Sequence, residues 1–374
     1  MPGLNLTRDE ARERAGTLEV GAYEVALDLT TGDKVFSSAT TIRFACRKPG
    51  ASTFVDLVAA SVDHVTLNGV LLEPADVFDG TRVHLDDLAA ENELRIVAEC
   101  EYSHTGEGLH RFVDPVDGNV YLYSQFEVID ARRMFACFDQ PDLKATFAFT
   151  VTAPADWEVV TNTAAEEVTD GPDGVRVHRF AATPRMSTYI TALVAGPYRV
   201  ARGEHTTPSG QVVPMGVYCR ESLGQHLDAD EILDVTKKGF DFYERLFDYP
   251  YPFGKYDQLF VPEFNAGAME NAGCVTFLED YVFRSKVTDA SYERRAETLL
   301  HEMAHMWFGD LVTMRWWDDL WLNESFATYM AYLAKERATR FTTSWVSFAN
   351  DEKAWAYRQD QLSSTHPIVA DIPD

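Results

Sequence analysis

The amino-acid sequence predicts a multidomain α+β protein, in which an antiparallel β-sandwich or saddle domain precedes a mixed α/β domain. Three observations support this fold class. Apolar and polar residues alternate over much of residues 1–200, with the period of two that marks half-buried strands. Turn-forming pairs that contain glycine separate these runs. Beyond about residue 200 the apolar spacing becomes helical, so we expect one domain over 1–200 and another over 201–374.

The strands of the first domain are indicated by short alternating runs, of which 23–29 and 147–151 are clear examples. Hairpin-type pairs recur between such runs. They are Gly32-Asp33, Asn68-Gly69, Asp79-Gly80 and Asp173-Gly174. A last β-like stretch at 212–218 lies beyond the expected domain boundary. Many short strands between turn signals favour an antiparallel β-domain.

Apolar residues at helical spacing predict three helices in the second domain, at about 227–247, 289–308 and 319–337. Pro250 and Pro252 follow the first helix, and Gly309 can end the second. In the third helix we expect a buried stripe at spacings of three and four, made of Phe326, Tyr329, Met330 and Leu333. We expect Trp316, Trp317 and Trp321 to belong to the core.

Composition excludes several classes of protein. The chain has 33 basic and 59 acidic residues, and its net charge of −26 would repel nucleic acids and anionic membranes. Its five cysteines are widely spaced and form no CxxC pair, which favours a reducing cytoplasm. We expect neither a signal peptide nor a membrane span, because no long apolar run occurs.

The chemistry is indicated by His301-Glu302-Met303-Ala304-His305, an H-E-x-x-H motif inside the second expected helix. Residues four apart project from the same helix face, so His301 and His305 can both bind one zinc ion. Glu302 lies about 100° around the helix axis from His301 and can stand beside the metal as a general base. The alternative is a pair of ordinary surface or core histidines.

A catalytic zinc needs a third protein ligand and one open position. Glu324 follows His305 after 18 intervening residues, near the start of the third expected helix. A continuous helix would carry Glu324 about 28 Å away, but a break at Gly309 lets the third helix fold back. We therefore expect one zinc ion held by His301, His305 and Glu324.

These motifs resemble the aminopeptidase N family of zinc metallopeptidases, which belong to the gluzincins. Glu324 lies in Trp-Leu-Asn-Glu-Ser-Phe-Ala at 321–327, and residues 267–271 read Gly-Ala-Met-Glu-Asn, the exopeptidase motif of that family. Further similarity runs through 121–147 and 251–257. The resemblance implies a β-domain over 1–200 that contributes to the amine site, and a thermolysin-like catalytic domain over 201–374. Within the family, the chain is more similar to the soluble bacterial enzymes.

The resemblance implies an aminopeptidase that hydrolyses peptides with zinc-activated water and with Glu302 as the general base. It implies that Glu270 and Glu127 bind the free α-amine of the substrate. The remaining peptide-binding positions that it implies are Gly267, Ala268, Met269 and Asn271. Gln125 and Ala266 match positions that line the first specificity pocket of relatives, so we expect N-terminal alanine, bulky apolar or basic residues to be accepted.

One expected feature is missing from this resemblance. In relatives, a segment similar to His366-Pro367-Ile368 precedes a tyrosine that donates to the oxyanion, and no tyrosine follows it here. The chain is therefore expected to be an N-terminal fragment whose catalytic domain is incomplete. Two alternatives stay open: a zinc-binding but catalytically silent peptide-binding or scaffold module, and an epoxide-hydrolase-type relative, which Ala268 mildly disfavours. The sequence does not indicate an oligomeric state.

Overall fold

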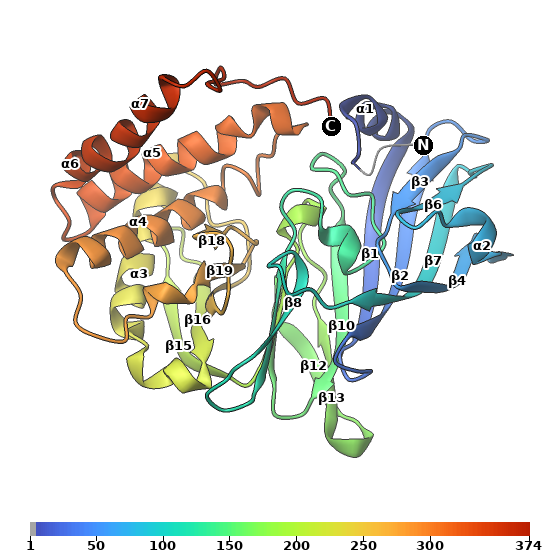
Figure 1. Ribbon diagram of the computed structural model, residues 1–374, viewed down its shortest axis with the longest axis horizontal. Coiled ribbons are helices and arrows are strands. Elements are labelled where there is room, and N and C mark those ends of the chain that lie inside the picture. The colour runs from blue at the N-terminus through green and yellow to red at the C-terminus, as the bar shows by residue number, and fades with distance from the viewer. Residues whose placement is uncertain (1–4) are drawn as a thin grey trace.

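A sheet of eight strands dominates the first half of the chain in the computed structural model, which describes residues 5–374 (Figure 1). In spatial order its strands are β12 (Ala165–Asp170), β13 (Val175–Phe180), β10 (Thr146–Pro154), β1 (Leu18–Asp28), β2 (Val35–Cys46), β7 (Glu91–Glu101), β4 (Ser61–Leu67) and β5 (Val70–Leu72). Buried and accessible residues alternate along β2 and β10, as the period of two predicts. Strand pairs in this sheet are antiparallel except that β1 and β10 run parallel, with Tyr23 opposite Phe147.

Two smaller sheets complete the β-rich half and share its hydrophobic core. One contains β11 (Glu158–Thr161), β14 (Leu193–Gly196), β9 (Val120–Gln125) and β8 (Gly108–Val113), and the other pairs β3 (Thr53–Asp56) with β6 (Arg82–Leu85). A short helix, α2 (Pro74–Val77), precedes β6. In the core, the Tyr23 ring stacks on Phe147 with centroids 4.7 Å apart, and Phe135 meets both rings edge-on.

A helix that the alternating pattern did not predict opens the described chain. Helix α1 (Arg8–Thr17) begins with a capping box, in which the Glu10 amide donates to Thr7 Oγ1 and the Thr7 amide donates to Glu10 Oε2. Arg14 then enters the core and pairs with Asp56 at 2.7 Å. Because α1 is strongly charged and carries a weak apolar stripe, these two features define it more than amphipathic spacing does.

The second half contains a mixed sheet of five strands. Its order is β15 (Tyr198–Thr206), β16 (Val212–Arg220), β17 (Tyr256–Val261), β19 (Cys274–Leu278) and β18 (Ala268–Met269). Strands β16, β17 and β19 run parallel, whereas the two outer strands pair antiparallel. Every residue of β17 is buried, as a central parallel strand requires. Strand β18 therefore forms one edge of this sheet.

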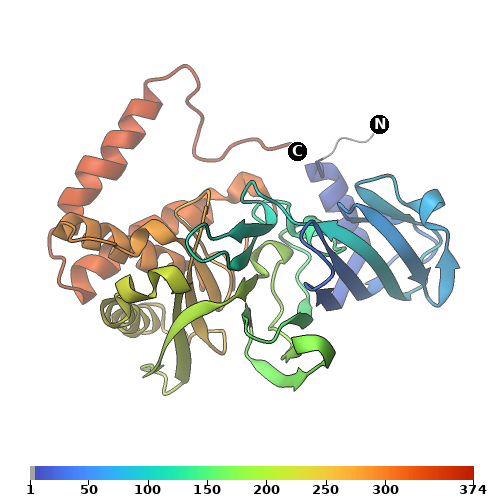
Figure 2. The same ribbon diagram turned by 60° about the horizontal axis from the view of Figure 1, so that its bottom comes forward.

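Helices cover this sheet and extend beyond it (Figures 1 and 2). They are α3 (Ala229–Phe247), α4 (Asp289–His305), α5 (Trp321–Ala338), α6 (Ser344–Phe348) and α7 (Ala354–Asp360), with a π-helical turn at Ala349–Lys353 between the last two. Helix α4 packs against both α3 and α5. Short 3-10 turns occur at 131–133, 172–174, 188–190, 221–226, 279–281 and 317–319. Among the helices of residues 5–374, none combines the length and apolar character that crossing a bilayer requires.

Two expectations for the third helix were wrong. Met330 and Leu333 are buried as expected and Phe326 is partly buried, but Tyr329 is 47% exposed. The buried face of α5 is centred on Ala327, Ala331 and Ala334, and Tyr329 lies on the opposite side of the helix. Trp321 is 38% exposed, whereas Trp316 and Trp317 are buried as expected. Trp321 opens α5 and lies outside its packed face.

The two halves are joined by buried contacts as well as by the chain. Gly196 ends β14 with φ +150°, and a Cβ there would lie 2.9 Å from the Val120 carbonyl oxygen, so only glycine fits this crossing. Arg220 at the end of β16 binds Asp114 and Glu279 at 2.5 and 2.6 Å. The C-terminal segment returns to α1, where the Arg8 amide donates to the Pro373 carbonyl (Figure 2).

Candidate metal centre and active site

Helix α4 presents two imidazole rings to one point. His301 and His305 are four residues apart and therefore project from the same face. Their Nε2 atoms face each other at 3.0 Å, and their ring centroids are 4.7 Å apart. His305 is fully buried, whereas His301 is partly accessible from a cavity. The four-residue spacing therefore places two ring nitrogens where both could bind one metal ion.

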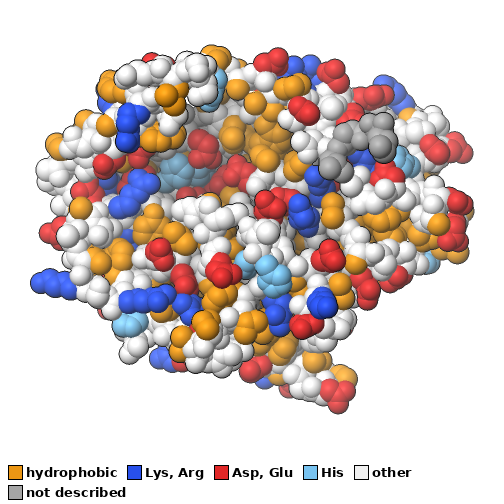
Figure 3. Space-filling view, viewed as in Figure 1, with side chains coloured by type: hydrophobic (Ala, Val, Ile, Leu, Met, Phe, Trp, Pro, Cys, Tyr) orange, Lys and Arg blue, Asp and Glu red, His pale blue; other side chains and the backbone are white. Residues whose placement is uncertain are grey.

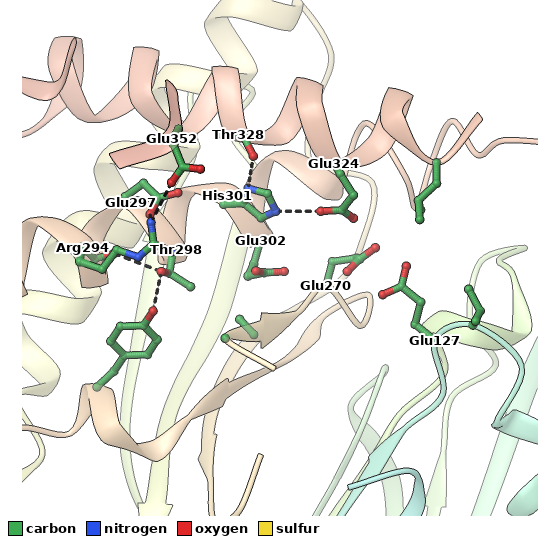
Figure 4. Close-up of a pocket in the computed structure, with 15 residues that line it drawn as sticks. Glu127, Glu270, Arg294, Glu297, Thr298, His301, Glu302, Glu324, Thr328 and Glu352 are labelled. Carbon is green, nitrogen blue, oxygen red and sulfur yellow. Dashed lines mark hydrogen bonds and ion pairs between the residues drawn. The ribbon is translucent and has the colours of Figure 1, made fainter. Parts of the chain in front are cut away.

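Glu324, in the first turn of α5, completes a set of three ligand atoms (Figure 4). Its Oε2 lies 3.4 Å from His301 Nε2, and its Oε1 lies 3.7 Å from His305 Nε2. The chain reverses between α4 and α5 at Gly309, whose φ is +133°. A Cβ on Gly309 would lie 3.2 Å from His305 Nδ1, so glycine here also leaves space for the buried ring.

The second nitrogen of each ring has its own partner, which fixes the ring orientation. His305 Nδ1 donates to the Phe308 carbonyl oxygen at 3.1 Å, and His301 Nδ1 lies 3.3 Å from Thr328 Oγ1. A proton on Nδ1 leaves the Nε2 lone pair free for a metal. Burial lowers the pKa of His305, which also favours the neutral ring that a metal requires.

The donor set fits zinc. Two imidazoles and one carboxylate are ligands that zinc takes in catalytic sites, and bonds of about 2.0–2.2 Å in a tetrahedron place ligand atoms about 3.3–3.6 Å apart. The three separations found here run from 3.0 to 3.7 Å. The neighbouring histidines lower the pKa of Glu324 to about 2, so this ligand is ionised. His301, His305 and Glu324 can therefore hold one metal ion.

Glu302 lies beside this set and is buried. One of its carboxylate oxygens lies within 4.8 Å of both a Glu270 oxygen and a His305 ring nitrogen. Burial raises the pKa of Glu302 well above its usual range, and the nearby Glu270 and Glu324 carboxylates raise it further. A cation at the metal centre offsets this cost and favours the ionised form, which can accept a proton.

Two further carboxylates converge from different halves of the molecule. Glu127 comes two residues after β9, and Glu270 comes directly after β18 (Figure 4). One oxygen from each lies within 4.8 Å of a Glu324 oxygen. The Oε1 atoms of Glu127 and Glu270 are buried without a hydrogen-bond partner. Burial, together with Glu324, raises the pKa of Glu270 to about 8, and burial also raises the pKa of Glu127.

Five of these six side chains, all except buried His305, line one cavity of about 550 Å³. Gly267 and Ala268 form part of its wall, and Figure 3 shows histidine and acidic side chains together in a hollow of this face. Met269 is buried beside it and its sulfur accepts from Gln125 Nε2 at 3.5 Å.

Four of the predicted binding residues do not line this cavity in the described structure, and buried Met269 is one of them. Asn271 is buried, and its Nδ2 donates to Thr276 Oγ1 at 3.2 Å. Gln125 is buried against Met269, and Ala266 is exposed on the loop before Gly267. The structure therefore brings the three candidate metal ligands, Glu302, Glu270 and Glu127 together, and places the other four residues behind or beside the cavity wall.

The cavity is also lined by a set of residues that the sequence did not indicate. They are Tyr281, Arg294, Glu297, Thr298, Leu320, Thr328 and Glu352, together with Val128 near Glu127. Arg294 lies 2.8 Å from Glu297 and 3.1 Å from Glu352. Glu297 precedes His301 by one helical turn, so its position was readable from the four-residue spacing. Glu352 comes from beyond α6, and no local pattern indicates it.

Comparisons with known proteins agree with this geometry. Residues 21–190 match the Peptidase M1 N-terminal domain, and residues 231–374 match the Peptidase family M1 domain. The chain is 59% identical to aminopeptidase N of Streptomyces lividans over 379 aligned residues, which cover all of this chain and 44% of that protein. It is 38% identical to probable aminopeptidase 2 of Sulfurisphaera tokodaii, covering 95% of this chain and 44% of the relative.

A third relative carries a different name. Tricorn protease-interacting factor F2 of Thermoplasma acidophilum is 32% identical, over 94% of this chain and 43% of that protein. The chain thus spans less than half the length of the curated relatives it matches. The two family matches lie in the expected order and together span both halves of the fold, including the cavity and the three ligands. The chain therefore belongs to peptidase family M1.

Proposed function

We propose that this chain carries the active site of a zinc-dependent aminopeptidase, which removes the N-terminal residue of a peptide. The observation that carries the proposal is the pair of buried carboxylates, Glu127 and Glu270, with unpartnered oxygens beside a His–His–Glu ligand set. Buried carboxylates without partners are costly, so such a pair indicates that a cation completes the site. A peptide's free α-ammonium is the cation that fits beside a hydrolytic metal.

One zinc ion per chain would be held by His301, His305 and Glu324. When bound, zinc polarises a carbonyl oxygen and lowers the pKa of water. Glu302 then accepts the proton of the attacking water on its carboxylate and delivers that proton to the leaving amine. Glu302 is buried except where it faces the cavity, so its carboxylate can reach a water held beside the ligands.

The two amine-binding carboxylates select the end of a chain over its middle. An ammonium between Glu127 and Glu270 positions the first peptide bond near Glu302, whereas an internal residue offers no cation to this pair. Strand β18 is an edge strand, so its free edge can pair with the main chain of a substrate. The small residues Gly267 and Ala268 leave this wall open. We extend the proposal to peptides that begin with alanine, a bulky apolar residue or a basic residue.

Substitution of the amine site tests this proposal. Glu270→Gln and Glu127→Gln are each expected to lower kcat/KM for an alanyl-anilide by about 10- to 100-fold, since each removes a buried charge-assisted hydrogen bond. Steady-state kinetics on zinc-loaded protein measures the effect. Glu166→Gln, at an exposed position of β12, is the matched control and should keep the wild-type value. Unchanged kcat/KM in both variants would show that Glu127 and Glu270 do not bind the substrate amine.

Metal loading provides a separate test. Zinc at about 1,000 times its Kd is expected to raise the Tm of the chelator-treated protein by about 5–10 °C, because the ion binds the folded state alone. Differential scanning calorimetry measures the shift. His305→Ala should abolish it, whereas His366→Ala, at an exposed histidine outside the cavity, should retain it. A zinc-dependent shift of full size in His305→Ala would show that the ligands are elsewhere.

A further inference from the structure

The hairpin of β8 and β9 lies at the boundary between the two halves and contacts the loop that leads into β18 (Figure 1). We call this loop, residues 262–267, the entry loop. Tyr123 on β9 donates its hydroxyl hydrogen to the Glu263 carbonyl oxygen at 3.1 Å, and its ring meets Phe264 edge-on with centroids 5.4 Å apart. Asn265 Nδ2 donates to the Thr105 carbonyl oxygen at 3.4 Å.

His110 on β8 makes the second anchor, and its tautomer follows from its neighbours. The ring is 1% exposed and stacks on Tyr123 with centroids 4.8 Å apart. Nδ1 accepts from the Gly106 amide at 3.1 Å, so in the neutral ring the proton resides on Nε2. Nε2 lies 3.2 Å from Glu263 Oε2 and can donate to it. Burial lowers the pKa of His110, which favours this neutral form.

The backbone of the entry loop requires such an anchor. Glu263 has a φ of +55°, a conformation that non-glycine residues rarely adopt. Its carbonyl oxygen and its carboxylate are both bound by the hairpin, through Tyr123 and His110. On the other side of the contact, Gly106 allows close approach, since a Cβ there would lie 2.7 Å from Asn265.

The two segments that meet in this contact, strand β9 and the entry loop, continue along the chain to Glu127 and Glu270 respectively. Strand β9 ends at Gln125, two residues before Glu127, and Gln125 Nε2 donates to Met269 Sδ. The entry loop continues through β18 to Glu270. The two carboxylates come from different halves of the molecule, so their separation depends on how the hairpin and the entry loop are held together.

We propose that His110 and Tyr123 are positioning residues that fix the entry loop on the β8–β9 hairpin and thereby hold Glu127 and Glu270 at the separation that accepts a substrate ammonium. The anchoring of the entry loop depends on the contacts alone, whereas its effect on ammonium binding rests on the proposed function. Neither residue lines the cavity, so both act through the two glutamates.

Two measurements on zinc-loaded protein test the proposal. The first is backbone hydrogen exchange over residues 262–271. The second is the Kd of L-alanine amide relative to that of N-acetyl-alanine amide, which lacks the cation. His110→Phe keeps an aromatic ring on Tyr123 but removes the donor to Glu263, and Tyr123→Phe removes a single hydroxyl. Each is expected to speed exchange of the entry loop by about tenfold and to weaken L-alanine amide selectively by about tenfold.

Three controls make the result specific. His110→Gln, whose amide can reach Glu263, should restore most of the wild-type behaviour. His84→Gln changes an exposed histidine of β6, outside both the hairpin and the entry loop, and should behave as wild type. Zinc content should stay at one per chain in every variant, so that a loss of amine affinity cannot come from metal loss.

Each outcome decides one part of the proposal. Unchanged exchange in both His110→Phe and Tyr123→Phe would overturn the anchoring contact. Faster exchange with an unchanged ratio of the two Kd values would overturn the link to the amine site. If Glu127→Gln and Glu270→Gln also leave that ratio unchanged, the proposed function fails at the amine site, while the exchange data still decide whether the hairpin anchors the loop.

Discussion

Replacing Glu302 with glutamine is expected to lower kcat for alanyl-anilide hydrolysis by about 10²–10⁴-fold while leaving zinc content unchanged. Glutamine has the same shape as glutamate but cannot accept the proton of the attacking water. Glu302 is not among the three convergent ligand atoms of His301, His305 and Glu324, so the metal should remain. Kinetics and elemental analysis on the same preparation measure both quantities.

A comparison with a ligand variant separates the two roles. His305→Ala should lose zinc and turnover together, whereas Glu302→Gln should lose turnover alone. Zinc-loaded Glu302→Gln that retains a tenth or more of wild-type kcat would assign the general base to another group. The neighbouring buried carboxylate of Glu270 would then be the first to examine, because it lies within 4.8 Å of Glu302.

Replacing Arg220 with methionine is expected to reduce the free energy of unfolding by about 3–5 kcal/mol. Arg220 pairs with Asp114 at 2.5 Å and with Glu279 through two contacts at 2.6 and 2.9 Å. The side chain of Asp114 is completely buried, and that of Glu279 is 10% exposed. Methionine fills a similar volume but leaves buried Asp114 without a cation, and it leaves Glu279 with only the exposed Arg284 at 3.5 Å. Because Asp114 belongs to the β-rich half, the change also loosens the boundary between the halves.

Denaturant unfolding monitored by circular dichroism measures this loss. Arg179→Met is the matched control, since its pair with Glu167 is about half exposed on both sides and should contribute at most about 1 kcal/mol. Arg220→Lys should recover part of the lost free energy of unfolding, because lysine restores the positive charge but cannot make the bidentate contact to Glu279. A loss of less than about 1 kcal/mol in Arg220→Met would mean that water reaches and solvates the two carboxylates.

Local spacing explains why the convergence of the candidate metal ligands could be predicted. The four-residue separation of His301 and His305 determines their common face on any helix, and the structure places Glu324 beside them. The exposure of Tyr329 and the burial of the alanines on α5 could not be predicted. Both sets of residues have helical spacing, and only tertiary packing decides which of them is covered.

The remaining features depend on contacts between distant parts of the chain. Thr328 reaches His301 across two helices, and Glu352 reaches Arg294 from beyond α6. His110 meets Glu263 across 153 positions of sequence. Such contacts leave no periodic signal, because each depends on how two elements dock. Helix α1 is a different case. Its capping-box residues, Thr7 and Glu10, can be read from the sequence, but α1 is strongly charged and lacks the apolar stripe by which a helix is usually predicted.

The four glutamates around the candidate metal centre also bear on how a cationic ligand would arrive. Glu127, Glu270, Glu302 and Glu324 share a recess of a protein whose net charge is already −26, and a cation bound there favours the ionised forms of the three whose pKa is raised by burial. Low-dielectric walls focus such a field outward, and the field accelerates encounter with cationic ligands. Dissolved salt screens this attraction over about 8–10 Å at ordinary ionic strength. Under the proposed function, the charges that hold an ammonium in place would therefore also draw positively charged peptide ends toward the cavity from a distance.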